Sequence, residues 1–265
     1  MALEVRNITC SFPKAQEPTL KDVSFCAPDG LVTSLIGANG VGKSTLLKTI
    51  MGLYSSTGTV LFNGIDRATI KPNQLFKYVS YMTQQGASIT SLKVLEVVLL
   101  GRMHSLHIKV DDAELEKAWS VLKLLKLEHL ANRPYCALSG GQQRIVCIAQ
   151  TIIREPRIFL LDEPTANLDM QNELEVLALI QAYTRQKNIT TVLTLHDLNM
   201  AARFSDKVIL LKDGSVYMDG SPEKVITKEA VCEAYGVQAH IHTDRNGMTM
   251  LYPMHSVYQQ EYHFN

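Results

Sequence analysis

The chain has 265 residues, 46% of them hydrophobic, and its 26 Lys and Arg side chains balance 26 Asp and Glu to a formal net charge of zero. These values are typical of a globular protein with a buried core, and they argue against a disordered, collagen-like or coiled-coil chain. Because there is no basic excess, we expect no nucleic-acid partner.

The composition of the chain also predicts neither secretion nor insertion into a membrane. Glu4 and Arg6 leave no apolar stretch for a signal peptide. The richest apolar stretches, 94–100 and 208–211, are far shorter than the roughly 20 residues that span a bilayer. Five scattered cysteines without a Cys-x-x-Cys pair predict buried thiols in a reducing compartment.

Short strands alternate with helices along the chain. Residues 31–36 are expected to form a buried strand, and the glycines after them lead into a helix over 43–51 that Gly52 can end. Further strands are expected at 59–62, 78–82, 158–161, 190–195 and 208–211. Asp213-Gly214 and Asn246-Gly247 predict hairpin turns, because these residues tolerate a positive φ angle. The alternation predicts an α/β architecture with a mostly parallel central sheet.

The stretch over 88–154 differs from its surroundings, because it shows helical periodicity and no convincing strand. One apolar helical stripe, with spacing i, i+3, i+4 and i+7, is formed by Ile145, Ile148, Ala149 and Ile152. We therefore expect a single domain over 1–265, in which a helical subdomain, 88–154, is inserted into a core made of 1–87 and 155–265.

A glycine-rich segment opens the helix over 43–51. Residues 37–44 read Gly-Ala-Asn-Gly-Val-Gly-Lys-Ser and match G-x-x-x-x-G-K-[ST], the pattern of a phosphate loop between a strand and a helix. The glycines let backbone N–H groups surround phosphates, Lys43 reaches the β- and γ-phosphates, and the Ser44 hydroxyl binds Mg²⁺. This context disfavours the alternative, a turn that matches by chance. The residues expected to contact the nucleotide here are Gly37, Asn39, Gly40, Gly42, Lys43, Ser44 and Thr45.

The apolar strand over 158–161 ends in two acids, Asp162 and Glu163. Taken alone, acids at a strand end are usually solvated turn residues. A phosphate loop, however, needs such a second strand beside it. In that setting Asp162 holds Mg²⁺ and Glu163 polarises the water that attacks the phosphate.

Residues 138–142, Leu-Ser-Gly-Gly-Gln, lie just before the apolar helix and place a hydroxyl and two glycines at a helix N-terminus. Because a chain with one phosphate loop needs no second anion site of its own, we expect a head-to-tail pair of chains. Each chain would contact the γ-phosphate held by the other through Ser139, Gly140, Gly141 and Gln142. The alternative is an ordinary Ser N-cap followed by permissive glycines.

Taken together, these motifs resemble the ATP-binding subunits of ABC transporters over nearly the whole chain. The segments that carry the resemblance occur in the family's order and approximate spacing, at 37–44, 138–142, 158–163, 166–169 and 194–197. The resemblance implies a P-loop NTPase (RecA-like) α/β core with an antiparallel β subdomain and an inserted helical subdomain. It also implies ATP and Mg²⁺ as ligands, ATP hydrolysis as the activity and a second copy of the chain as partner.

The resemblance also suggests roles for residues outside these derivations. Gln84 is similar to a glutamine that links the subdomains and contacts Mg²⁺, Asp169 to the acid of a dimer-crossing loop, and His196 to a histidine that senses the γ-phosphate. Phe12 falls where the family has an aromatic residue that stacks on adenine. Without the family, His196 would be a strand-end histidine and Phe12 a core-facing strand residue. Ile145 stands where relatives carry arginine, which we expect to affect contacts of that helix but not the phosphate site.

Within the family, segments 99–102, 196–202 and 234–237 are similar to the ATPases of iron-siderophore, haem and cobalamin importers. The resemblance implies the ATPase subunit of a type II ABC importer, a homodimer under two copies of a separate permease at the cytoplasmic face of the cell membrane. A substrate-binding protein would be an indirect partner. An ABC exporter and a soluble ABC-type mechanoenzyme are the alternatives.

A group of polar residues near the C-terminus raises the question of a metal site. These residues are His240, His242, Asp244, His255 and His263. No cysteine or further acid completes a compact set of ligands, so we interpret them as surface and hairpin residues.

Overall fold

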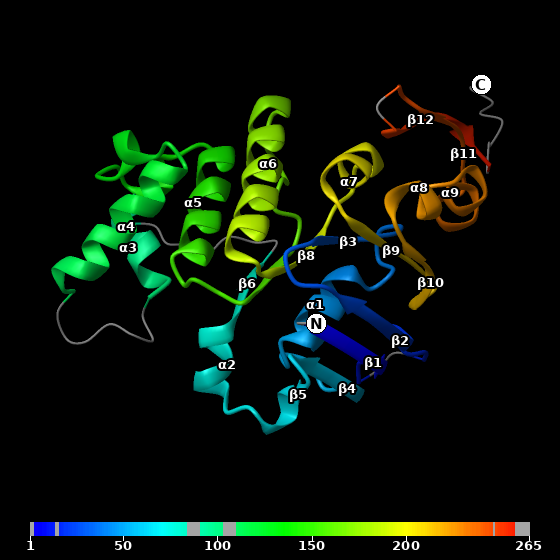
Figure 1. Cartoon of the computed structure of the whole chain (residues 1–265), viewed down its shortest axis with the longest axis horizontal. Coiled ribbons are helices and arrows are strands. Elements are labelled where there is room, and N and C mark those ends of the chain that lie inside the picture. Colours follow the sequence, from blue (N-terminus) through cyan, green and yellow to red (C-terminus); the bar gives the residue numbers. More distant parts are fainter. Residues whose placement is uncertain (1–2, 14–15, 84–90, 103–109, 246, 258–265) are drawn as a thin grey trace, which may run out of the picture.

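A six-stranded sheet of order β10-β9-β3-β8-β7-β6 runs through the centre of the computed structural model, which describes residues 3–13, 16–83, 91–102, 110–245 and 247–257 (Figure 1). Its strands are β3 (Val32–Ile36), β6 (Val79–Met82), β7 (Ile158–Leu161), β8 (Thr190–Thr194), β9 (Lys207–Lys212) and β10 (Ser215–Gly220). All neighbours are parallel except β9 and β10. Strands β3, β7 and β8 are buried throughout, as expected of strands covered on both faces.

A second sheet, of order β2-β1-β4-β5, is antiparallel. It consists of β1 (Leu3–Cys10), β2 (Leu20–Ala27), β4 (Thr57–Phe62) and β5 (Ile65–Asp66). The predicted strand at 59–62 is β4, which therefore belongs to this sheet and not to the parallel one. The other five predicted strands are confirmed in the central sheet, and none of their ends differs from the prediction by more than one residue.

Helix α1 (Lys43–Ile50) lies between the two sheets, where Leu46, Leu47 and Ile50 join a core with buried residues of both. Gly52 follows this helix with a φ of 77°, which confirms the predicted helix end. On the other face of the central sheet, α6 (Met170–Lys187) and α7 (Leu198–Phe204) cover a second core (Figure 1). Smaller helices complete this region, namely α2 (Pro72–Tyr78), α8 (Pro222–Val225), α9 (Lys228–Tyr235) and the 3₁₀ turn Arg67–Thr69.

Between β6 and β7 the regular elements of the described residues are helices, and we call this stretch the helical segment. They are α3 (Val94–Leu100), α4 (Asp112–Leu124) and α5 (Gly140–Ile152), with 3₁₀ turns at Glu128–Leu130 and Tyr135–Ala137. Of the predicted apolar stripe, Ile148 and Ile152 pack into the core under α6, whereas Ala149 packs into a separate core of the helical segment. Helix α5 thus belongs to both cores.

Helices α3 and α5 approach closely at Gly101, the residue after α3. A Cβ atom added there would collide with the carbonyl oxygen of Gln150 on α5. The two helices can therefore contact through backbone only because position 101 has no side chain.

Both predicted hairpins are present. Asp213 and Gly214 have φ angles of 51° and 81° and join β9 to β10. Strands β11 (Val237–Thr243) and β12 (Thr249–Ser256) form an antiparallel pair whose turn includes Gly247, with Asn246 outside the described residues. His240 and His242 lie exposed on β11, and His263 is outside the described residues. Within the described part of the chain, no group of three or more His, Cys, Asp or Glu is arranged to hold a metal ion.

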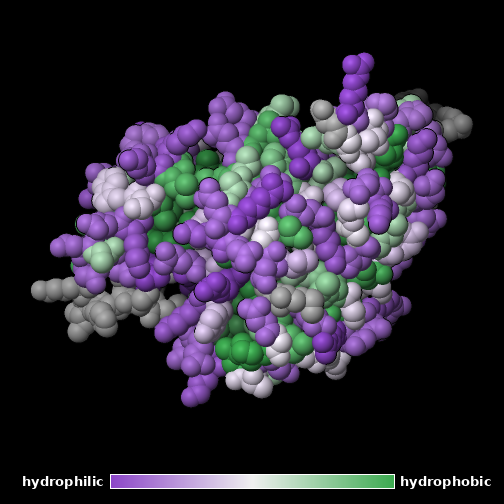
Figure 2. Space-filling view, viewed as in Figure 1, coloured by the Kyte–Doolittle hydropathy of each residue, from purple (hydrophilic) through white to green (hydrophobic). Residues whose placement is uncertain are grey.

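The face of the molecule in Figure 2 carries mostly hydrophilic side chains, with smaller apolar patches between them. Most large apolar side chains are in the three cores instead. Among the helices that the structure describes, none is both long and apolar enough to cross a membrane.

Candidate functional site

The segment between β3 and α1 is a tight turn built on glycines. Gly37 has a φ of 143°, and a Cβ atom there would lie 2.5 Å from the carbonyl oxygen of Leu211. Gly42 is the N-cap residue of α1, with a φ of 109°. Because Gly42 has no side chain to accept from them, the first N–H groups of α1 open into the pocket described below, as an anion-binding site requires.

The Lys43 side chain folds back on this turn. Its Nζ donates to the carbonyl oxygens of Gly37 at 2.6 Å and Ala38 at 3.0 Å, and the residue is 6% exposed. Burial lowers the pKa of Lys43, and the nearby charges of Glu163 and Asp162 partly oppose that shift. A buried ammonium group is therefore already in place beside the helix N-terminus.

Asp162, at the end of β7, is 1% exposed and accepts hydrogen bonds from three hydroxyl groups. Ser44 Oγ and Thr194 Oγ1 each donate to Oδ1 at 3.0 Å, and Tyr81 OH donates to Oδ2 at 3.4 Å. Burial, followed by the charge of Asp162, raises the pKa of Tyr81, which keeps its hydroxyl protonated as a donor. The structure thus places the predicted pair, Ser44 and Asp162, in direct contact.

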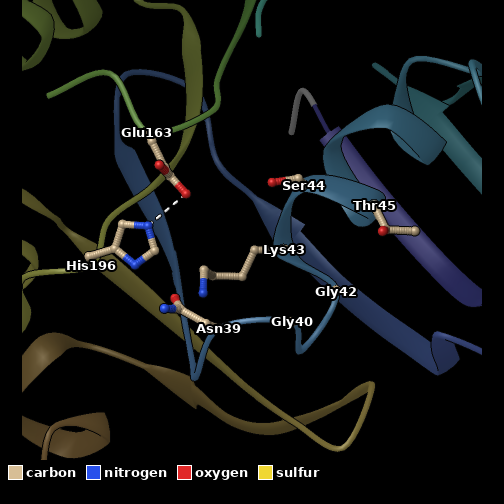
Figure 3. Close-up of a pocket in the computed structure, with 8 residues that line it drawn as sticks. All are labelled: Asn39, Gly40, Gly42, Lys43, Ser44, Thr45, Glu163 and His196. Atoms are coloured by element: carbon tan, nitrogen blue, oxygen red, sulfur yellow. Dashed lines mark ion pairs between the residues drawn. The ribbon is translucent and has the colours of Figure 1, made fainter. Parts of the chain in front are cut away.

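Glu163 and His196 close the pocket on the side opposite Ser44 and Thr45, with Lys43 between them (Figure 3). His196 Nε2 lies 2.6 Å from Oε1 of Glu163. The pocket has a volume of about 330 Å³ and is lined by Asn39, Gly40, Gly42, Lys43, Ser44, Thr45, Glu163 and His196. Backbone donors, one cation, hydroxyls and a carboxylate with a histidine are the groups that phosphoryl transfer to water needs.

The Ser-Gly-Gly segment, 138–142, does not line this pocket of its own chain. Ser139 caps α5, because its Oγ accepts from the N–H of Gln142 while the Gln142 side chain accepts from the N–H of Ser139. The N-cap interpretation is therefore correct within one chain. Ser139 and Gly140 are also exposed, so a second molecule can reach them.

Two further predicted site residues, Asp169 and Phe12, are exposed, and a third lies outside the described residues. Asp169 is exposed and caps α6 by accepting from the N–H of Asn172 at 2.8 Å. Phe12 lies after the end of β1, is 37% exposed and packs edge-on against Tyr54 with ring centroids 5.0 Å apart. The interpretation of Phe12 as a core-facing strand residue is therefore wrong. Gln84 is outside the described residues.

Three residues of the site were missed by sequence reasoning, namely Thr194, Tyr81 and Arg144. Thr194 and Tyr81 hold the Asp162 carboxylate. The sequence feature that could have identified both is their position at or near the ends of strands that run parallel to β7. Arg144 on α5 donates to backbone carbonyls of the turn that follows β7. Helix α5 thus contacts the turn that carries the acids through Arg144, the residue before Ile145.

The family model for ABC transporters matches residues 20–166. This chain belongs to the ABC transporter family. An uncharacterized ABC transporter ATP-binding protein of Methanocaldococcus jannaschii is 40% identical, over 96% of this chain and 98% of that protein. A hemin import ATP-binding protein of Roseobacter denitrificans is 35% identical, over 92% and 94%. An iron(3+)-hydroxamate import ATP-binding protein of Bacillus subtilis is 34% identical, over 85% of each.

Solved ABC transporter structures share the fold. A chain of an inward-facing ABC transporter described as of the metal-chelate type superposes with a TM-score of 0.82 at 27% identity, over 97% of this chain and 98% of that one. A dimeric ATP-binding cassette in a post-hydrolysis state, bound to ADP and phosphate, superposes with a TM-score of 0.75 at 30% identity, over 83% and 98%. The expected P-loop NTPase fold, with its antiparallel β sheet and its helical insertion, is confirmed for this ABC protein.

Proposed function

We propose that the chain is the ATP-hydrolysing subunit of a type II ABC importer that takes up an iron complex, a siderophore or haem. The proposal rests on the pocket in which Lys43, Ser44 and Glu163 converge around the N-terminus of α1. Import is supported by the relatives, which are named for hemin and iron(3+)-hydroxamate import. Their names favour an iron complex over cobalamin, and import over export or a soluble mechanoenzyme.

The chemistry follows from the groups around the pocket. The triphosphate binds to the N–H groups of the phosphate loop and to Lys43, which exchanges its carbonyl partners for phosphate oxygens. Glu163 takes a hydrogen bond from the attacking water and orients it toward the γ-phosphate. His196, bound to Glu163, holds that carboxylate and senses whether the γ-phosphate is present.

The residues around Asp162 fit a Mg²⁺ ion. A buried carboxylate next to the Ser44 hydroxyl provides hard oxygen ligands of the kind that Mg²⁺ prefers. Asp162 and Ser44 would hold the ion, with Gln84 as the third group. When bound, Mg²⁺ neutralises charge on the β- and γ-phosphates.

In this proposal two chains form a head-to-tail dimer, and each supplies Ser139, Gly140, Gly141 and Gln142 to the nucleotide of the other. Asp169 lies at the crossing point between the chains, and Phe12 stacks on the adenine. The core, 1–87 and 155–265, binds the nucleotide, and the helical subdomain, 88–154, meets a permease that holds the dimer at the cytoplasmic face of the membrane. A substrate-binding protein delivers the iron complex to that permease.

The test of the chemistry is Glu163→Gln, which keeps the shape of the side chain and removes its charge. We expect hydrolysis to fall by about 10²–10⁴-fold, because a positioned base contributes that much. ATP binding should survive, and a dimer that the parent forms only briefly should persist with MgATP in size-exclusion chromatography. Full turnover by the variant would show that another group is the base and would overturn the assignment.

The test of transport is uptake into proteoliposomes that contain this chain together with an iron-complex permease with which it assembles. We expect ATP-dependent accumulation of haem or of a ferric siderophore, and none when the chain carries Glu163→Gln. Accumulation of cobalamin alone would correct the cargo. ATP-dependent loss of a preloaded compound would instead identify an exporter.

A further inference from the structure

The guanidinium group of Arg144 lies at the junction between the helical segment and the turn that carries the acids. Arg144 is on α5 and is 6% exposed. Its Nε donates to the carbonyl of Pro164 at 3.3 Å, and Nη2 donates to the carbonyls of Asp162, at 2.6 Å, and Glu163. Its Nη1 donates to the carbonyl of Thr83, directly after β6, at 3.1 Å. One side chain of the helical segment thus holds the backbone at the ends of two central strands.

The backbone that Arg144 holds is unusual at Glu163. This residue has a φ of 51°, in the left-handed region that a residue with a side chain rarely adopts. Its N–H donates to Thr194 Oγ1 at 2.7 Å, and its carbonyl accepts from Arg144. Glu163 is therefore held on both sides of its Cα atom, and this conformation aims its side chain at the pocket.

A buried arginine at this place is more than a packing residue. Burial lowers the pKa of Arg144, which means that the charged group is kept in an environment that disfavours it. An uncharged side chain of similar length would fill the same space without that penalty. The guanidinium group of Arg144, however, is a planar fork of donors that can bond several carbonyls at fixed angles. Neither lysine nor glutamine can do so.

We infer that Arg144 is a positioning residue for ATP hydrolysis, which sets the backbone of Glu163 and ties its orientation to the position of α5. The inference rests on the proposed role of Glu163. It follows that a movement of α5 relative to the central sheet displaces the carboxylate that orients water. Because the Ser139 end of the same helix faces a second chain in the proposed dimer, Arg144 links the arrival of that chain to the chemistry.

The test compares Arg144→Gln with Arg154→Gln. Arg154 also donates to a backbone carbonyl, that of Gly101 at 2.9 Å, and burial also lowers its pKa. Its bond stays within the helical segment, so it controls for the loss of a partly buried arginine. We expect both variants to lose thermal stability, whereas only Arg144→Gln should lose about 10²-fold in the single-turnover rate with excess enzyme, since a 1 Å misplacement of a catalytic group can cost that much. The Kd for ATP should change by less than about twofold, since the phosphate contacts remain.

A second measurement separates positioning from folding. In Arg144→Ala, millimolar guanidinium ions should restore part of the hydrolysis rate, whereas the same concentration of urea should not. Equal rates in Arg144→Gln and the parent, with Glu163→Gln inactive, would overturn this inference and leave the proposed function standing. Full activity of Glu163→Gln would overturn the proposed function itself. Equal loss in Arg144→Gln and Arg154→Gln without rescue would assign Arg144 to stability alone.

Discussion

His196 Nε2 lies 2.6 Å from Oε1 of Glu163, so residues that follow two neighbouring parallel strands, β8 and β7, meet across one end of the pocket. The two partners differ in exposure, since the side chain of His196 is 49% exposed and that of Glu163 is 13% exposed. The histidine therefore reaches in from the solvent side and fixes a carboxylate that is mostly enclosed. We therefore expect the two residues to act together, and mutation of each can measure its separate contribution to hydrolysis.

The first prediction concerns this unit. His196→Ala should lower the hydrolysis rate by less than the about 10²–10⁴-fold loss expected for Glu163→Gln, because the histidine acts through the carboxylate. The double variant should be no slower than Glu163→Gln alone, since the partner that His196 positions is already gone. Single-turnover rates at saturating MgATP check this. Losses that multiply in the double variant would mean that His196 contacts the phosphate independently of Glu163.

The second prediction concerns the hydroxyl of Thr194, which donates to Asp162 and accepts from the N–H of Glu163. Thr194→Val should lower the free energy of unfolding by about 1–3 kcal/mol, because it leaves a buried N–H group and a carboxylate oxygen short of a partner. Thr33 on β3 provides the matched control. It is equally buried, and in the described part of the chain its hydroxyl has no hydrogen-bond partner. Thr33→Val should be neutral or stabilising in urea unfolding, and a similar loss in both variants would refute the role given to Thr194.

The third prediction concerns Lys43. Lys43→Ala should weaken ATP binding about tenfold or more, because a charge-assisted hydrogen bond contributes about 1.5–3 kcal/mol. Because burial lowers the pKa of Lys43, the ammonium loses its proton at a lower pH than an ordinary lysine. ATP affinity of the parent should therefore fall with rising pH before the usual lysine value of about 10.4 is reached.

The stability of the folded protein should change with pH in the opposite direction to the ATP affinity. In the same pH range the unfolded chain holds the proton of Lys43 and the folded chain does not, so the stability of the nucleotide-free protein should rise with pH through this group. Calorimetric titration with ATP at increasing pH measures the first effect, and urea unfolding measures the second. The contribution of this residue should vanish in Lys43→Ala. A parent and variant with the same pH dependence would contradict the prediction.

The fourth prediction concerns the exposed end of α5. Ser139→Arg should abolish ATP-dependent dimerisation and turnover, because a long cation blocks the approach of a second chain, while nucleotide binding to the monomer persists. Thr227→Arg is the control, since Thr227 caps α9 in the same way by accepting from the N–H of Ala230. Both variants should lose about 0.5–2 kcal/mol of stability with the cap. Dimerisation of Ser139→Arg in size-exclusion chromatography with MgATP would exclude the head-to-tail arrangement.

The sequence predicts those parts of the fold in which local pattern and tertiary role agree. Strands such as β7 and β8 are short apolar runs because both faces are covered, and the phosphate loop is recognisable because its glycines meet backbone constraints. The pairing of Ser44 with Asp162 followed from the requirement for a second strand beside the loop. Each of these predictions depends only on residues close together in the sequence, or on one motif that is known to accompany a phosphate loop.

The parts that could not be predicted depend on contacts between distant residues. Strands β1 and β2 were not predicted individually, because polar and apolar residues alternate irregularly around bulges in their pairing. The alternation of residues gave no sign that β4 leaves the parallel sheet. The helical pattern around Arg144 gave no sign of its role, because only the turn after β7, which lies outside that helix, makes it a buried donor.

The close approach of α3 and α5 at Gly101 has a mechanical consequence. Because no side chain separates the two helices at this point, no rotamer change there can absorb a displacement of one helix relative to the other. A displacement of α3 by a partner should therefore move α5 with it. Because the Cβ atom of any side chain at position 101 would collide with the carbonyl oxygen of Gln150, such a substitution should force the two helices apart, and it should weaken both the fold and the coupled movement of α3 and α5.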